Sequence, residues 1–123
     1  MQTRTVLVFR LLFVGAVLGV TVLSVVPTPQ IDGLESDKMG HFIAYAVLAL
    51  LLVPSVSADG RMHKGLGAGL PLLFLYGVLI EVLQHYIGRQ FDFRDMAANA
   101  IGVLVGAGVG LATRFLIRRR QTR

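Results

Sequence analysis

Acidic, basic and amide side chains interrupt an otherwise apolar chain, and their types are those used in acid–base chemistry. Glu81 lies inside one long apolar run, and His41 lies near the start of another. A carboxylate and an imidazole in contact can move a proton, order a water molecule or form an ion pair. Glu81 and His41 are therefore the candidate catalytic residues if the chain is an enzyme, which the sequence leaves open.

The polar residues follow helical spacing, so they share helix faces. The first face carries Asp37, His41 and Tyr45. The second carries Glu81, Gln84, His85 and Gly88. The third begins with Asp95 and Asn99 and continues as the glycines Gly102, Gly106 and Gly110. Glycines at this spacing let membrane helices approach closely, so the third face predicts a packed helix interface that leads into the polar groups.

The apolar runs that must position these residues are long enough to cross a membrane. The chain has 123 residues, 54% hydrophobic and 15% charged, with a mean hydropathy of +0.70. A span needs about 20 mostly apolar residues, and four stretches qualify: Leu7–Val26, Met39–Val56, Leu66–Ile87 and Met96–Ile117. The first has no small-residue cleavage site, so we expect an uncleaved span. The sequence predicts an all-α, polytopic membrane protein in which residues 1–123 form a single domain.

The basic residues predict how the spans are oriented. Nine of the 12 Lys and Arg residues lie in the N-terminal region, the second loop and the tail, which includes the basic stretch 118–123. The positive-inside rule then places both termini in the cytoplasm, and the net charge of +5 needs no nucleic-acid partner. In this orientation the three polar faces meet at the outer membrane level. Glu81 would lie about 9 Å inside its span, at roughly 1.5 Å per residue. It would need a partner, a proton or a water-filled pocket there, because an unpaired charge that faces lipid is costly.

The remaining polar residues suggest ligand binding. Lys38, Arg89 and Arg94 could hold a phosphate or carboxylate. Asp95 precedes an apolar helical run and reads as its N-cap, and Asn99 could bond between helices or to a ligand. His41, Glu81, His85 and Asp95 could together hold a metal, but there is no diagnostic spacing such as H-E-x-x-H. The chain has no cysteine, which excludes thiolate metal sites. We expect no metal and no cofactor.

Two segments, "DKMGHFIAYAVLALLL" and "EVLQHYIGRQFDFRDMAANAIGVLVG", resemble the VanZ-like family of bacterial membrane proteins. The resemblance covers residues 37–106. It places on the family motif Asp37, Lys38, His41, Phe42, Tyr45, Glu81, Gln84, Arg89, Asp92, Asp95, Asn99 and Gly102, with Asp92 the least secure. The family is named for a teicoplanin resistance determinant. The resemblance thus implies the bacterial cytoplasmic membrane and a link to the cell envelope and to glycopeptide resistance, but it supplies no reaction.

Three functions remain open. The chain could bind an envelope component, a lipid head group or a peptidoglycan precursor, through Asp37, Lys38, Tyr45, Gln84, Arg89, Asp92, Asp95 and Asn99. It could be a membrane enzyme that uses Glu81 and His41 on a lipid-linked substrate. It could also be an accessory subunit that forms homo- or hetero-oligomers through the seam of Gly102, Gly106 and Gly110 or the seam of Gly15 and Gly19.

Overall fold

Four helices make up the part of the chain that the computed structural model describes, which is residues 3–26, 36–57 and 60–123, with the backbone alone at 36 and 37. They are α1 (Thr3–Val25), α2 (Ser36–Ser55), α3 (Met62–Tyr86) and α4 (Phe93–Gln121). All four are long and apolar enough to cross a membrane. The predicted all-α architecture with four spans is confirmed.

The helices begin three to four residues earlier than the apolar runs predict, because polar first turns are also helical. The prediction that Asp95 caps the last helix was wrong. Asp92, and not Asp95, caps α4: its side chain accepts a hydrogen bond of 2.8 Å from the backbone N–H of Arg94. Asp95 lies instead in the first turn of α4 and is buried. After α3, Gly88 takes a φ of +94°, which favours glycine and reverses the chain.

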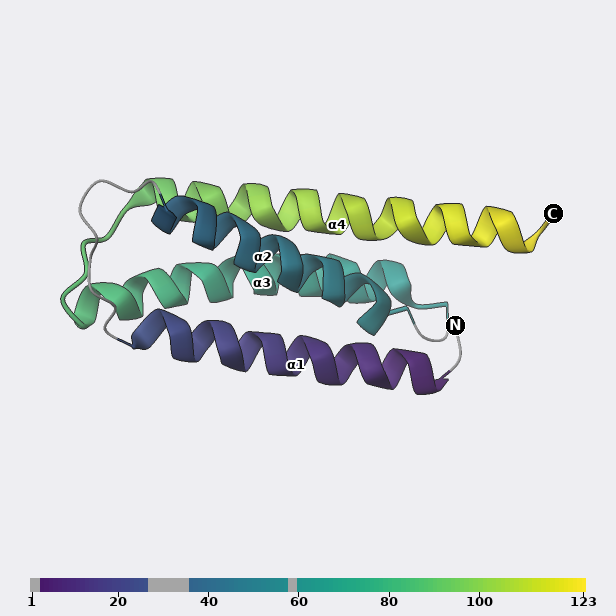
Figure 1. The fold of residues 1–123 in the computed structure, drawn as a ribbon, viewed down its shortest axis with the longest axis horizontal. Coiled ribbons are helices and arrows are strands. Elements are labelled where there is room, and N and C mark those ends of the chain that lie inside the picture. Colours follow the sequence, from purple (N-terminus) through teal and green to yellow (C-terminus); the bar gives the residue numbers. More distant parts are fainter. Residues whose placement is uncertain (1–2, 27–35, 58–59) are drawn as a thin grey trace.

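Successive helices run in opposite directions, so the start of α1 and the end of α4 lie at the same end of the bundle (Figure 1). α2 contacts all three other helices. The buried core at its centre consists of Tyr45, Leu48, Ala49, Leu73, Val103 and Ala107. α1 lies at the edge, and Val6 is the one residue of this helix that is fully buried.

α2 and α4 are held together by backbone contact. Gly102 and Gly106 face the main chain of α2, where a methyl group at Gly102 would lie 2.5 Å from the carbonyl oxygen of Phe42. A methyl group at Gly106 would overlap the carbonyl of Ala46. Gly110, further along, faces the side chain of Val53. The glycine seam therefore serves contacts within this chain.

Polar contacts attach α1 to the bundle in addition to apolar packing by Phe13, Ala16, Val17 and Val20. The hydroxyl of Tyr76 on α3 lies 2.7 Å from the hydroxyl of Thr21 and donates to the carbonyl of Val17 at 3.2 Å. Near the termini, Arg10 Nε donates to the carbonyl oxygen of Ser55 at 2.9 Å. These bonds join α1 to α3 and α2 where few of its apolar side chains are buried.

Candidate functional site

The polar residues collect at one end of the bundle, which we call the polar end. It comprises the start of α2, the end of α3 and the start of α4, and it lies opposite the two termini (Figure 1). Its buried polar residues are His41, Glu81, Gln84, Asp95 and Asn99. Three helices thus deliver polar groups to one level of an otherwise apolar bundle.

His41 connects α2 to α4. Its Nδ1 lies 3.0 Å from Asn99 Oδ1, and its Nε2 lies 3.8 Å from Asp95 Oδ2. An amide oxygen can only accept a hydrogen bond, so Nδ1 carries the hydrogen in this pair. Nε2 is then the ring atom turned toward the carboxylate of Asp95.

Glu81 is held by the backbone of the turn that follows its own helix. The residue is 1% exposed, and its Oε1 accepts a hydrogen bond of 3.1 Å from the backbone N–H of Asp92. Among the described atoms, Oε2 is buried without a hydrogen-bond partner. A buried polar atom without a partner is costly, so Oε2 marks a place where a proton, a water molecule or an ion is required.

Gly77 leaves space for the side chains of Asn99 and Tyr45, and it was not identified from the sequence. A methyl group at Gly77 would lie 3.1 Å from Asn99 Nδ2 and 3.1 Å from the ring of Tyr45. Both Asn99 Nδ2 and the Tyr45 hydroxyl are buried without a hydrogen-bond partner in the described structure. The signal that could have revealed Gly77 is its position four residues before Glu81, on the same helix face.

A pocket of about 250 Å³ opens beside this cluster. Its polar lining residues are His41, Tyr45, Gln84 and Arg89. Its apolar lining residues, Val20, Leu23 and Ala44, come from α1 and α2, and Ser24 and Gly40 complete the lining. Gln84 Nε2 donates to the carbonyl of Ser24 at 3.2 Å, which fixes α1 against α3 at the pocket. The contribution of α1 could not be foreseen, because the first apolar run carries no polar residue of the predicted site.

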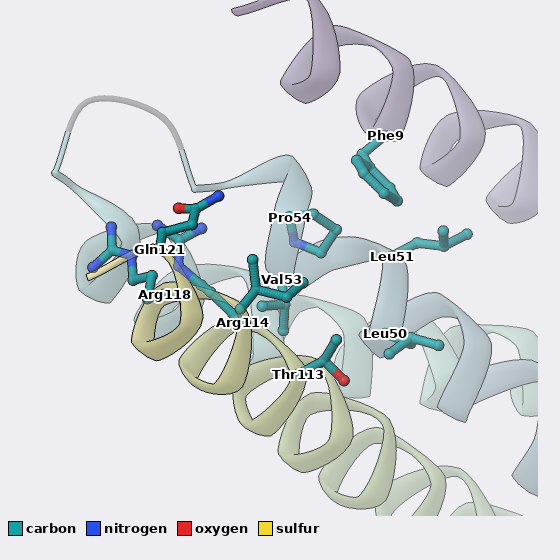
Figure 2. Close-up of a pocket in the computed structure, with 11 residues that line it drawn as sticks. Phe9, Leu50, Leu51, Val53, Pro54, Thr113, Arg114, Arg118 and Gln121 are labelled. Carbon is teal, nitrogen blue, oxygen red and sulfur yellow. The ribbon is translucent and has the colours of Figure 1, made fainter. Parts of the chain in front are cut away.

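A larger cavity, about 370 Å³, lies at the end where the termini are. Its lining is mostly aliphatic and aromatic, including Phe9, Leu51 and Pro54, and Arg114 and Arg118 stand along its α4 side (Figure 2). Because this cavity lacks the acid, imidazole and amide groups of the polar end, its greater size does not make it the better candidate for chemistry.

Other predicted site residues lie at the margin of the cluster. Lys38 is half-buried, Arg94 and His85 are exposed, and Asp92 is half-buried as the cap of α4. His85 packs edge-on to the ring of Tyr86, with 6.2 Å between ring centroids. The side chain of Asp37 lies outside the described part of the structure. The described site therefore centres on His41, Glu81, Asp95 and Asn99.

One protein-family model matches the part of the chain that contains this site. A family model described as VanZ/LLP1 matches residues 6–116, which span all four helices. The chain belongs to the VanZ/LLP1 family. No curated protein matches the chain. No solved structure matches it either.

In this VanZ/LLP1 protein, one donor atom each from His41, Glu81 and Asp95 come within 4.8 Å of one another, and all three residues are buried. Two carboxyl groups and an imidazole at this spacing can share a proton, activate a water molecule or bind a cation. Arg89, on the wall of the adjoining pocket, adds a group that pairs with phosphate or carboxylate.

Proposed function

We propose that this VanZ/LLP1 protein binds a phosphate-bearing component of the cell envelope, a lipid head group or a lipid-linked peptidoglycan precursor, in the pocket at the polar end. The observation that carries the proposal is that one pocket is lined both by polar His41, Gln84 and Arg89 and by apolar side chains of α1 and α2. A guanidinium and an amide suit the charged oxygens of a head group, and aliphatic side chains suit the first carbons of its chains.

The positive-inside rule supports an outward-facing pocket. The arginines in the last turn of α4 lie at the end of the bundle opposite the polar end, so a cytoplasmic tail puts the pocket at the outer leaflet of the bacterial cytoplasmic membrane. Envelope precursors carry their phosphate and sugar groups there after they are exported. A role in teicoplanin resistance, which the family resemblance suggests, would follow from occupancy or alteration of such a component.

The test is the lipid that accompanies the protein when it is purified in a mild detergent. Mass spectrometry should find a phosphate-bearing lipid enriched with the wild type and depleted at least about tenfold with Arg89→Gln, which corresponds to about 1.4 kcal/mol. His85→Gln is the matched control, because His85 is exposed near the same end of α3. Equal enrichment in the wild type and Arg89→Gln, with both folded, would refute the proposed pocket.

A membrane enzyme is the second candidate. It is favoured because Glu81, which has one carboxylate oxygen without a described hydrogen-bond partner, lies near the imidazole of His41. Glu81 would act as general acid or base, His41 as its partner, and Asn99 would hold the imidazole in one orientation. Turnover separates the two functions. A purified protein that retains its lipid unchanged over time is a binder, whereas one that releases a product and loses that activity in Glu81→Gln is an enzyme.

The accessory function through glycine seams is weaker at one seam than at the other. Gly102, Gly106 and Gly110 pack against α2 of the same chain, so they are occupied. A methyl group added at Gly15 or Gly19 on α1 would have no described atom within 4 Å, so that seam alone could face another subunit. Association that persists in Gly19→Leu would remove it as well.

A further inference from the structure

We propose that His41, Glu81 and Asp95 form a binding site for one divalent transition-metal ion. One residue comes from each of α2, α3 and α4, and their nearest donor atoms lie within 4.8 Å of one another. The sequence named these residues, with His85, as a possible metal set, but no spacing singled them out, because metal motifs on one helix place their ligands three or four residues apart. Here the bundle brings the ligands together.

The geometry of His41 is that of a metal ligand with its second nitrogen fixed. Metal-bound histidines usually donate the other ring N–H to an oxygen acceptor, and His41 Nδ1 donates to Asn99 Oδ1. The remaining Nε2 lies 3.8 Å from Asp95 Oδ2, beyond hydrogen-bonding distance. Two ligands that are each about 2.1 Å from a tetrahedral ion lie about 3.4 Å apart, so a small side-chain adjustment would close the pair around an ion.

Glu81 supplies the third ligand in the same manner. The backbone N–H of Asp92 holds Oε1, which leaves Oε2 buried without a hydrogen-bond partner in the described structure. Outer partners that orient a ligating carboxylate in this way are typical of metal sites. Asn99 and the Asp92 backbone therefore act as positioning groups, and the ligands are the three ionisable side chains.

Charge gives a reason for an ion. Two buried carboxyl groups and one imidazole lie close together in a bundle built to sit in a membrane, where an unbalanced negative charge is costly. A divalent cation balances both carboxylates at once. The alternative is that other groups at the polar end balance these charges, and the two possibilities predict different metal binding.

The donor set indicates the class of ion. One imidazole nitrogen and two carboxylate oxygens suit Zn²⁺ or Mn²⁺, and the chain has no thiolate to select softer ions. Three protein ligands leave a coordination position open. One of the three ligands, His41, also lines the pocket at the polar end. A phosphate oxygen of the head group would fill the open position, and that step rests on the proposed function. The metal site itself does not depend on it.

The test uses the full chain in lipid-depleted detergent micelles, stripped with chelator and titrated with Zn²⁺ alone. The wild type should bind one Zn²⁺ per chain, and Zn²⁺ should raise its thermal midpoint. Glu81→Gln and Asp95→Asn should each lose both effects. Asn99→Ala should weaken binding about 10- to 100-fold, because it removes a positioning group. His63→Gln and His85→Gln are the controls, since both histidines are exposed.

Co²⁺ keeps the test decisive if a variant does not fold. Bound to the folded wild type, it should give visible absorption bands of a low-coordinate nitrogen and oxygen site, and Zn²⁺ should displace it. The proposal is overturned if the wild type binds no ion, if the ligand variants bind as tightly as the wild type, or if only the control histidines matter. A failure of this kind leaves lipid enrichment by the pocket unaffected, and loss of lipid enrichment alone leaves the metal site standing.

Discussion

Gly102→Ala should destabilise the protein and open its polar end, although alanine is the better helix former. An added methyl group would lie 2.5 Å from the carbonyl oxygen of Phe42 and 3.1 Å from the backbone nitrogen of Ala46. Ordinary contacts of a Cβ atom begin near 3.4 Å, so the two helices must separate by about 1 Å. The atoms in the way belong to the backbone, so no side-chain rotation can relieve the overlap.

The magnitude follows from two effects. Overpacking of this kind costs about 1–3 kcal/mol. The same separation would stretch the 3.0 Å contact between His41 and Asn99 past hydrogen-bonding distance, which costs about 1 kcal/mol more. Gly108→Ala is the matched control, because Gly108 lies on the same helix with no atom within 4 Å of the added position. Both variants gain about 1 kcal/mol of helix propensity, so Gly102→Ala should be about 2–4 kcal/mol less stable than Gly108→Ala.

Equilibrium unfolding in mixed micelles measures the difference in free energy of unfolding. The nitrogen chemical shifts of the His41 ring report separately on its bond to Asn99, and they should change in Gly102→Ala and stay constant in Gly108→Ala. Equal stability of the two variants would refute the reasoning, since it would mean that α2 and α4 are not in backbone contact at this level.

Three further predictions concern hydrogen bonds of α1 and the orientation of the basic tail. Tyr76→Phe removes the hydroxyl that bonds α1, so it should cost about 1 kcal/mol of unfolding free energy, whereas Tyr86→Phe, at a side chain 81% exposed, should cost nothing measurable. Arg10→Leu breaks the bond to the Ser55 carbonyl and should cost about 1.5–3 kcal/mol; stability equal to the wild type would mean that this bond contributes nothing. Replacing the arginines of 118–120 with glutamate should weaken cytoplasmic retention of the tail, measured with a C-terminal topology reporter, and an unchanged reporter signal would count against the positive-inside assignment.

The helices and their polar end could be predicted from the sequence because both depend on local patterns. Apolar runs give the spans, and spacings of three and four give the faces, so Glu81 and Gln84 could be assigned to one side of α3. Helical periodicity does not say which neighbour a face meets. It could not reveal that His41 bonds to Asn99 across α2 and α4, or that α1 forms a wall of the pocket.

The turn before α4 explains both the wrong cap prediction and why the donor to Glu81 could not be foreseen. Asp95 looked like the cap because it directly precedes the apolar run, but helix formation needs only capped backbone groups and not apolar residues. The helix therefore starts at Phe93 under the cap of Asp92. The same turn provides the backbone N–H that binds Glu81. A search for partners among charged side chains could not find a donor that belongs to the main chain.

The bond between Glu81 and the backbone of Asp92 joins the interior of the bundle to its surface. A proton or an ion that reaches this carboxylate changes how strongly it holds the turn, because a charged acceptor makes the stronger hydrogen bond. This hydrogen bond therefore couples the turn of residues 87–92 to whatever binds Glu81 in the interior. A molecule in contact with that turn from outside the bilayer could sense the change without entering the pocket.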